Sequence, residues 1–206
     1  MVDGISFMVE NVSTMKDDAS VNERIAAQVR RLRGERGLSL DALSSQCGVS
    51  RSMLSLIERG ETSPTAVVLD KLAAGLGVPL ASLFDAPGHG LDPVARHADQ
   101  VTWQDPHSGY LRRNVSPEGA QTPTRIVDVT FPPQARVTYE AGARTPAVVQ
   151  QIWMLAGQMH VTYGSQSWLL ERGDCLAIPL DAPNAFHNPG DVPARYAVVL
   201  TTLARS

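Results

Sequence analysis

The side chains that most often carry catalysis or bind metals are few in this chain, and they are not grouped. The two cysteines, Cys47 and Cys175, lie far apart and form no CxxC pair, which argues against a disulfide scaffold or a cysteine-based zinc site. Both are expected to be buried free thiols. No two histidines are spaced as HxH or HxxxH; the five are His89, His97, His107, His160 and His187. We interpret them as solvated or hydrogen-bonded imidazoles rather than ligands.

Arginines are the chemically active residues that do cluster. Arg30, Arg31, Arg33 and Arg36 fall within one short stretch. The net charge of −3 and the pI near 5.9 argue against a polyanionic partner. The charge is uneven, however: residues 1–19 carry −3, residues 20–85 carry +1 and residues 86–206 carry −1. The distribution therefore allows a local basic face in the middle segment.

Periodicity and capping residues predict five short helices over residues 20–85. The first begins at a capping box of Ser20 and Glu23 and ends near Gly34. The later caps are Ser39, Ser50 and Ser63, the last followed by Pro64 at the first helical position, and a final helix runs from Pro79 to about Phe84. The second and third helices are joined by the turn Gly48–Val49–Ser50, a spacing typical of a helix-turn-helix.

The segments RGLSL, GVSRSMLS, IERG, SPT and LGVPLASLF occur in this order within residues 20–85. In this respect residues 20–85 closely resemble the lambda-repressor-like, or xenobiotic-response-element, family of DNA-binding domains. The resemblance implies that the third helix enters the major groove, with Arg51, Ser52 and Ser55 at base edges. The guanidinium of Arg51 can donate two hydrogen bonds to O6 and N7 of a guanine. The alternative is that Arg51 is solvated or contacts a phosphate.

The resemblance also implies contacts to the DNA backbone and a brace inside the domain. Candidates for phosphate contacts are Ser39, Ser50, Arg59 and Thr62, although capping alone would explain the two serines. Arg33 and Glu58 match positions that pair in the family, so we interpret them as structural. Leu56 stands where the family often has glutamine, and packing is favoured over contact with a thymine methyl.

Beyond residues 86–98, which are rich in proline and glycine as a linker is, turn signals recur every eight to twelve residues. Between them lie six predicted strands: RIVDVTF, VVQQIWML, MHVTY, SWLLE, CLAIPL and RYAVVLTTL. This spacing predicts an all-β sandwich or barrel over residues 99–206. The stretches WMLAGQMHVTYG and LERGDCLAIPLDAPNAFHNPGD resemble the cupin family, a double-stranded β-helix or jelly roll. The resemblance implies a sensing and dimerising domain.

The ligand set of metal-binding cupins is missing. In register with the family, the glutamate position falls on Gln150, the paired histidines fall within 144–146, and the third histidine falls on Asn184. Amides, a proline and an arginine are poor donors for a divalent transition metal, so no metal and no cofactor is expected.

A metal-free barrel can still hold a small molecule in a largely apolar pocket. Strand alternation from Gln150 turns Ile152 and Met154 to the same side, and Asn184 and Arg144 could add polar groups, Arg144 suiting a carboxylate or phosphate. The alternative is a plain filled barrel, with Arg144 on an exposed loop and the two amides satisfying one another. Trp153, Trp168 and Tyr139 are expected in the core or in a dimer interface.

The sequence thus predicts a multidomain fold: a tail at 1–19, expected to be mobile, an all-α helix-turn-helix domain at 20–85, a linker at 86–98 and an all-β cupin domain at 99–206. With no apolar run near ~18 residues and no secretory signal, the cytoplasm is the expected location, without membrane contact. The predicted function is that of a homodimeric transcriptional regulator that binds double-stranded DNA at a palindromic operator and senses a small-molecule effector. The alternatives are a DNA-tethered cupin enzyme and a DNA-binding scaffold whose cupin only dimerises.

Overall fold

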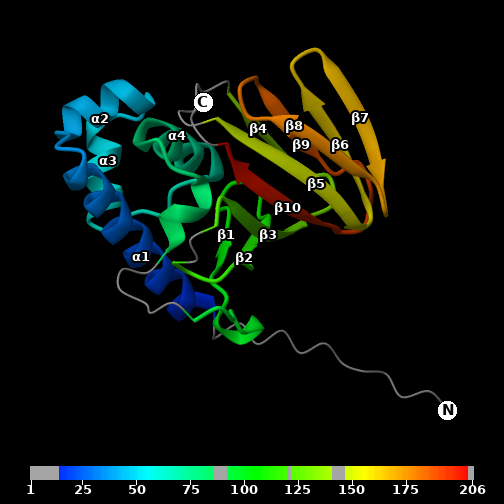
Figure 1. The fold of residues 1–206 in the computed structure, drawn as a ribbon, viewed down its shortest axis with the longest axis horizontal. Coiled ribbons are helices and arrows are strands. Elements are labelled where there is room, and N and C mark those ends of the chain that lie inside the picture. Colours follow the sequence, from blue (N-terminus) through cyan, green and yellow to red (C-terminus); the bar gives the residue numbers. More distant parts are fainter. Residues whose placement is uncertain (1–13, 86–91, 120–121, 141–146, 204–206) are drawn as a thin grey trace.

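The structure, a computed structural model, describes residues 14–85, 92–119, 122–140 and 147–203 and divides them into a helical part and a β-barrel (Figure 1). Four α-helices form the first part: α1 (Thr14–Glu35), α2 (Leu40–Cys47), α3 (Arg51–Glu58) and α4 (Ala66–Leu76). The fifth expected helix is a 3-10 helix, η1 (Leu80–Phe84), and a second short one, η2, spans His97–Asp99. The prediction of five α-helices is therefore wrong in its count. A segment of five residues is too short to close more than one α-helical turn, and 3-10 geometry is common in such short connectors.

Two helix starts also differ from the predictions. Helix α1 begins at Thr14 rather than Ser20, because the six residues before Ser20 contain no glycine or proline to stop it. Helix α4 is capped by Thr65, not Ser63: the Thr65 hydroxyl accepts from Val68 N at 3.4 Å. Proline at position 64 favours an extended conformation in the residue before it, so the helix starts later. The predicted caps at Ser39 and Ser50 are confirmed, with the hydroxyls accepting from Ala42 N and Met53 N.

Ten strands form the β-barrel. They are β1 (Thr102–Gln104), β2 (Leu111–Asn114), β3 (Thr124–Phe131), β4 (Arg136–Tyr139), β5 (Val148–Ala156), β6 (Gln158–Tyr163), β7 (Gln166–Glu171), β8 (Cys175–Pro179), β9 (Asn184–His187) and β10 (Ala194–Thr202). They pair antiparallel in a six-stranded sheet, ordered β1-β2-β3-β10-β5-β8, and a four-stranded sheet, ordered β4-β9-β6-β7. All six predicted strands are present, and β1, β2, β4 and β9 were not predicted.

Alternation along β5 is as predicted. Gln150, Ile152 and Met154 are buried, whereas Gln151 and Trp153 face outward. Trp153 is 51% exposed, so it does not occupy the core position that was one of the two expected for it. Cys47 is buried as expected, but Cys175 is exposed, so that prediction is wrong for the second cysteine. Cys175 begins an edge strand and lies opposite Trp153 on the outer side of the sheet.

The two parts pack directly against each other. The Asp105 carboxylate, in the loop between β1 and β2, accepts from Ala66 N at 2.9 Å, at the first turn of α4. The ring of Phe84 in η1 lies 5.9 Å from that of Trp103 in β1. Ion pairs also cross between the parts, Lys71–Glu140 at 2.8 Å and Arg24–Glu118 at 2.5 Å. The helical part is thus fixed on the barrel by buried as well as exposed contacts.

Within the described residues, no helix combines the length and the apolar character that a membrane span requires.

Candidate DNA-binding face and interdomain cavity

The predicted base-reading residues lie together on one exposed face. Arg51, Ser52 and Ser55 line a shallow depression with Leu40, Leu56 and Arg59. Arg51 is highly exposed, and its Nε lies 3.2 Å from Asp41 Oδ1. Since this ion pair is solvated, little free energy opposes its exchange for a base or phosphate partner. Leu56 is half-buried on this face and does not belong to the core, contrary to the packing that the sequence favoured.

The phosphate candidates lie around this face. Ser39 and Ser50 are exposed and cap α2 and α3, so their hydroxyls are partly engaged. Arg59 donates to both carboxylate oxygens of Glu61, at 2.7 and 2.8 Å, and to the Ser55 hydroxyl. The hydrogen bond from Arg59 lowers the pKa of the Glu61 carboxyl. Thr62 is half-buried nearby.

A partly buried ion pair holds α3. Arg33 of α1 donates from Nε and Nη2 to the two Glu58 carboxylate oxygens, at 2.6 and 2.8 Å, and from Nη1 to Leu38 O at 2.8 Å. The hydrogen bond to Glu58 raises the pKa of Arg33. Arg30 donates to the backbone carbonyl of Glu58. The pairing predicted for Arg33 and Glu58 is confirmed, and it fixes the end of α3 against α1.

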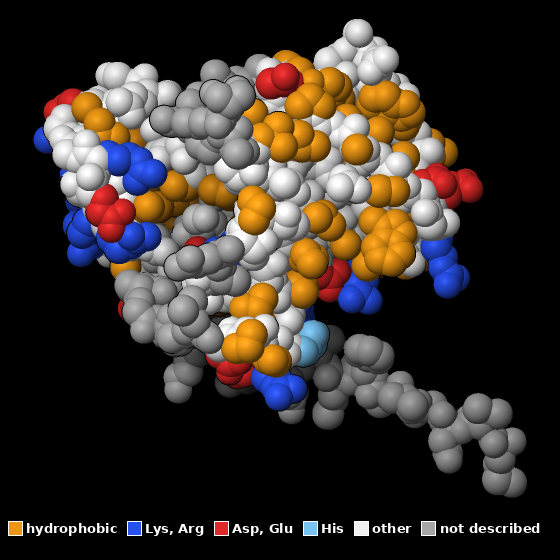
Figure 2. Space-filling model, viewed as in Figure 1, with side chains coloured by type: hydrophobic (Ala, Val, Ile, Leu, Met, Phe, Trp, Pro, Cys, Tyr) orange, Lys and Arg blue, Asp and Glu red, His pale blue; other side chains and the backbone are white. Residues whose placement is uncertain are grey.

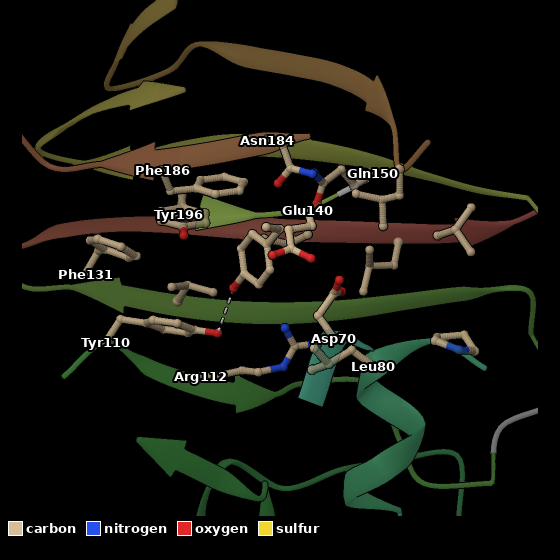
Figure 3. Close-up of a pocket in the computed structure, with 17 residues that line it drawn as sticks. Asp70, Leu80, Tyr110, Arg112, Phe131, Glu140, Gln150, Asn184, Phe186 and Tyr196 are labelled. Carbon is tan, nitrogen blue, oxygen red and sulfur yellow. Dashed lines mark hydrogen bonds between the residues drawn. The ribbon is translucent and has the colours of Figure 1, made fainter. Parts of the chain in front are cut away.

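A cavity of about 70 Å³ lies where the barrel meets the helical part (Figure 3). Asp70 of α4, Pro79 and Leu80 line it from the helical side. Its polar lining residues are Asp70, Tyr110, Arg112, Tyr139, Glu140, Gln150 and Asn184. Figure 3 shows Arg112 and Asp70 on one side, Gln150 and Asn184 on the other, and Glu140 between them. The cavity therefore belongs to both parts of the chain.

The structure brings together two of the five predicted pocket residues. Gln150 and Asn184 line the cavity, but Ile152 and Met154 are buried in the barrel without bordering it. Arg144 lies outside the described residues. Asn184 Nδ2 donates to Ala182 O at 3.3 Å, and Gln150 Nε2 is buried with no acceptor among the described residues. Neither amide nitrogen therefore donates to the oxygen of the other amide, so the expected mutual satisfaction is not found.

Five polar residues of the cavity were not among the predicted pocket residues: Asp70, Tyr110, Arg112, Tyr139 and Glu140. Tyr139 was expected in the core or in a dimer interface. Arg112 is only 8% exposed, and its Nε and Nη2 meet no acceptor in the described part of the chain. The hydroxyls of Tyr110 and Tyr139 form a hydrogen bond of 3.2 Å with each other. Burial raises the pKa of Tyr110 and raises that of Tyr139 well above its usual value. Both phenols stay protonated and can donate. Arg112 and Tyr139 lie on β2 and β4, two strands that the sequence pattern did not reveal.

No three His, Cys, Asp or Glu side chains in the described ranges come together in a way that could hold a metal ion. At the positions where related barrels carry metal ligands, the cavity presents the amides of Gln150 and Asn184.

The fold and the two sites define a helix-turn-helix protein with a cupin domain. Family comparison agrees, matching residues 29–83 to a helix-turn-helix family (HTH_3) and residues 128–200 to the cupin domain (Cupin_2). The chain belongs to the helix-turn-helix family of transcriptional regulators.

Relatives support this over different lengths. The chain is 26% identical over 180 residues, 81% of its length, to the HTH-type transcriptional regulator SutR of Escherichia coli (strain K12), of which 88% is covered. It is 39% identical over 54 residues, 26% of its length, to the HTH-type transcriptional regulator y4dJ of Sinorhizobium fredii, of which 70% is covered. A crystal structure of an HTH_3 family transcriptional regulator from Vibrio cholerae superposes with a TM-score of 0.75 at 28% identity, covering 91% of this chain and 99% of that one.

Proposed function

We propose that this protein is a homodimeric, sequence-specific DNA-binding regulator whose metal-free cupin domain senses a small molecule. The observation that carries the sensing step is the cavity lined from both parts of the chain. A molecule in it touches Asp70 and Leu80 of the helical part as well as the barrel strands. Occupancy can therefore change how the helical part docks, provided that the ligand binds the two arrangements with different affinity.

DNA binding is assigned to the exposed face of α3. Arg51 and Ser52 stand at its N-terminal end, where a recognition helix meets base edges, and Ser55 lies one turn further along. The partly buried pair of Arg33 and Glu58 keeps this helix in a fixed orientation. One such face makes few base contacts, so useful affinity requires two copies on a palindromic site with half-sites about 34 Å apart or a multiple of that.

Dimerisation is assigned to the outer face of the six-stranded sheet. Its outward side chains include Ile126 on β3, Ala197 and Val199 on β10, and Trp153 on β5, which face one another across neighbouring strands. Figure 2 shows apolar side chains gathered over the barrel. A contiguous exposed apolar patch of this kind marks an interaction site, and a second copy satisfies the requirement for two recognition helices.

The dimer assignment has a direct test. Trp153→Glu should convert the full-length protein from dimer to monomer in size-exclusion chromatography with light scattering. Leu169→Glu is the matched control, because Leu169 is also 51% exposed but lies on the other sheet. A dimer that survives Trp153→Glu would move the interface elsewhere.

Selection of bound sequences from a random duplex library, with full-length protein at a stated salt concentration, tests the function as a whole. A palindromic consensus is expected. On that site Arg51→Ala should weaken binding by about 1–3 kcal/mol, with a smaller loss on random DNA. An equal loss on both would make Arg51 a phosphate contact, and a folded protein that enriches no sequence would contradict the proposal.

A further inference from the structure

We propose that the interdomain cavity binds a small monocarboxylate that carries a second, uncharged oxygen, and that Arg112 holds its carboxylate. This inference rests on the proposed role of the cavity as the effector site and names the chemical class of the effector.

The first argument is the state of Arg112. The Arg112 residue is more than nine-tenths buried, and its Nε and Nη2 meet no acceptor in the described part of the chain. Burying a charged group without hydrogen-bond partners costs free energy, which a bound acceptor would offset. Nε and Nη2 form the edge of the guanidinium that accepts a carboxylate through two parallel hydrogen bonds. Arg33, Arg59 and Arg195 each use this edge for a carboxylate, at 2.6–3.0 Å. In Arg112 the same edge meets no acceptor among the described residues.

The second argument is the charge around the cavity. Asp70 and Glu140 border it together with Arg112, and Glu140 also pairs with Lys71 at 2.8 Å. Arg112 is the one cationic side chain among the described lining residues, so the cavity offers no partner for a second negative charge on the ligand, which disfavours phosphate and dicarboxylates. The remaining lining is largely apolar, with Leu80, Val129 and Leu200 among its members. A monocarboxylate with a short carbon chain matches both features.

The third argument comes from the opposite side and from the size of the cavity. Gln150 Nε2 is a second buried donor that meets no acceptor within the described ranges, and Figure 3 places Gln150 across the cavity from Arg112. A hydroxyl or keto oxygen on the ligand would satisfy it without adding charge. A single water needs a space of about 10–15 Å³, so a cavity of about 70 Å³ has room for a small molecule rather than for water alone. Hydroxy and oxo acids of three or four carbons are of this size.

The position of Arg112 also connects the ligand to DNA binding. Its guanidinium carbon lies 5.9 Å from the centre of the Phe84 ring, in the 3-10 helix that completes the helical part. Leu80 of the same helix lines the cavity. A carboxylate that draws Arg112 into two new hydrogen bonds therefore changes a contact on which the helical part is docked.

The test uses the full-length protein and four series of candidate ligands, each with three to six carbons. They are 2-oxo acids, 2-hydroxy acids, unsubstituted carboxylates and the corresponding neutral amides. Inorganic phosphate is a further probe. Thermal unfolding identifies binders, since a molecule that binds only the folded state raises Tm, and calorimetry gives Kd. At least one 2-oxo or 2-hydroxy acid should raise Tm and bind more tightly than its unsubstituted carboxylate and its amide.

The variants are Arg112→Met, which removes the charge, and Arg112→Lys, which keeps the charge but not the two-point geometry. Arg112→Met should raise the Kd of the tightest-binding acid by about 30-fold or more. Arg112→Lys should raise it by less. Arg113→Met is the matched control, because Arg113 is the next residue of β2 and turns to His97 O. It should leave Kd unchanged. Circular dichroism checks that every variant is folded.

The outcomes separate this inference from the proposed function. If no acid binds wild-type protein, or if Arg112→Met binds the best acid as well as wild type does, the carboxylate assignment is overturned. A neutral amide that binds wild type and Arg112→Met equally would overturn it while retaining the cavity as an effector site. Enrichment of a palindrome in the DNA selection, with no probe binding, would retain DNA binding alone.

Discussion

Asp105 makes a buried connection between the two parts of the chain, and its removal should be costly. The side chain is 2% exposed and accepts three hydrogen bonds, from Ala66 N at 2.9 Å, Ser108 N at 2.8 Å and the Ser108 hydroxyl at 2.5 Å. Hydrogen bonds to a charged group contribute about 1.5–3 kcal/mol, and a charge at a helix N-terminus adds up to ~1 kcal/mol. Helix-cap substitutions cost about 0.5–2 kcal/mol. Because the contacts are not additive, we expect Asp105→Ala to lower the free energy of unfolding by about 2–4 kcal/mol.

Urea unfolding followed by circular dichroism measures this loss, with two graded controls. Asp105→Asn keeps an acceptor for Ala66 N and should lose less than Asp105→Ala. Ser108→Ala leaves the contact between the two parts intact and removes one hydroxyl, so it should cost about 1 kcal/mol. If Asp105→Ala cost no more than Ser108→Ala, the connection to α4 would contribute nothing measurable and the argument would fail.

Three further predictions concern single side chains. Gly75→Ala should lower the stability measured by thermal unfolding by about 1–3 kcal/mol, because the new Cβ would lie 2.6 Å from Cys47 Cβ and this clash outweighs the better helix propensity of alanine. Gly34→Ala in α1 is the control: no atom lies within 4 Å of its new Cβ, so it should be neutral or stabilising in the same measurement. Burial raises the pKa of the Cys47 thiol, and Cys47 is inaccessible in the folded protein. In a Cys175→Ser variant, which lacks the exposed thiol, a thiol reagent at pH 8 should therefore label nothing until urea is added. Rapid labelling of the folded variant would contradict this. Burial raises the pKa of Asp85, so the folded state binds more protons than the unfolded state in acid, and stability falls as pH rises through this range. Asp85→Asn should therefore be more stable than wild type at pH 7, with the difference shrinking towards pH 4, and a pH-independent difference would refute the assignment.

Short-range signals explain which elements could be predicted. The caps at Ser39 and Ser50 and the alternation along β5 depend on residues a few positions apart, so the sequence pattern contains them. The strands that were missed are short, three or four residues each, which leaves little room for a pattern of alternation. Two of them also pair with a distant segment, since β4 pairs with β9 across some 45 residues. In such strands the hydrogen bonds to neighbours, rather than local preference, decide the conformation.

The residues of the candidate sites also differ in whether a signal in the sequence could identify them. Arg51, Ser52 and Ser55 were predicted because one short helix brings them to one face, and the structure shows them lining one depression. Gln150 and Asn184 were found through their places in the cupin pattern. Arg112 carried no such signal, since an arginine in a short polar strand normally faces solvent. Only the docking of η1 over β2 buries it.

Residue type and local spacing in the sequence predicted a helical domain with a helix-turn-helix spacing, followed by an all-β sandwich or barrel. The resemblance to known families supplied the two fold families and the register in which the metal-ligand positions carry other residues. The tertiary structure alone decided that the cavity lies between the two parts, and that a buried arginine with two unused donors faces it. The physical reason is that burial and the lack of a hydrogen-bond partner are properties of an environment, which residues distant in the chain create when they pack together.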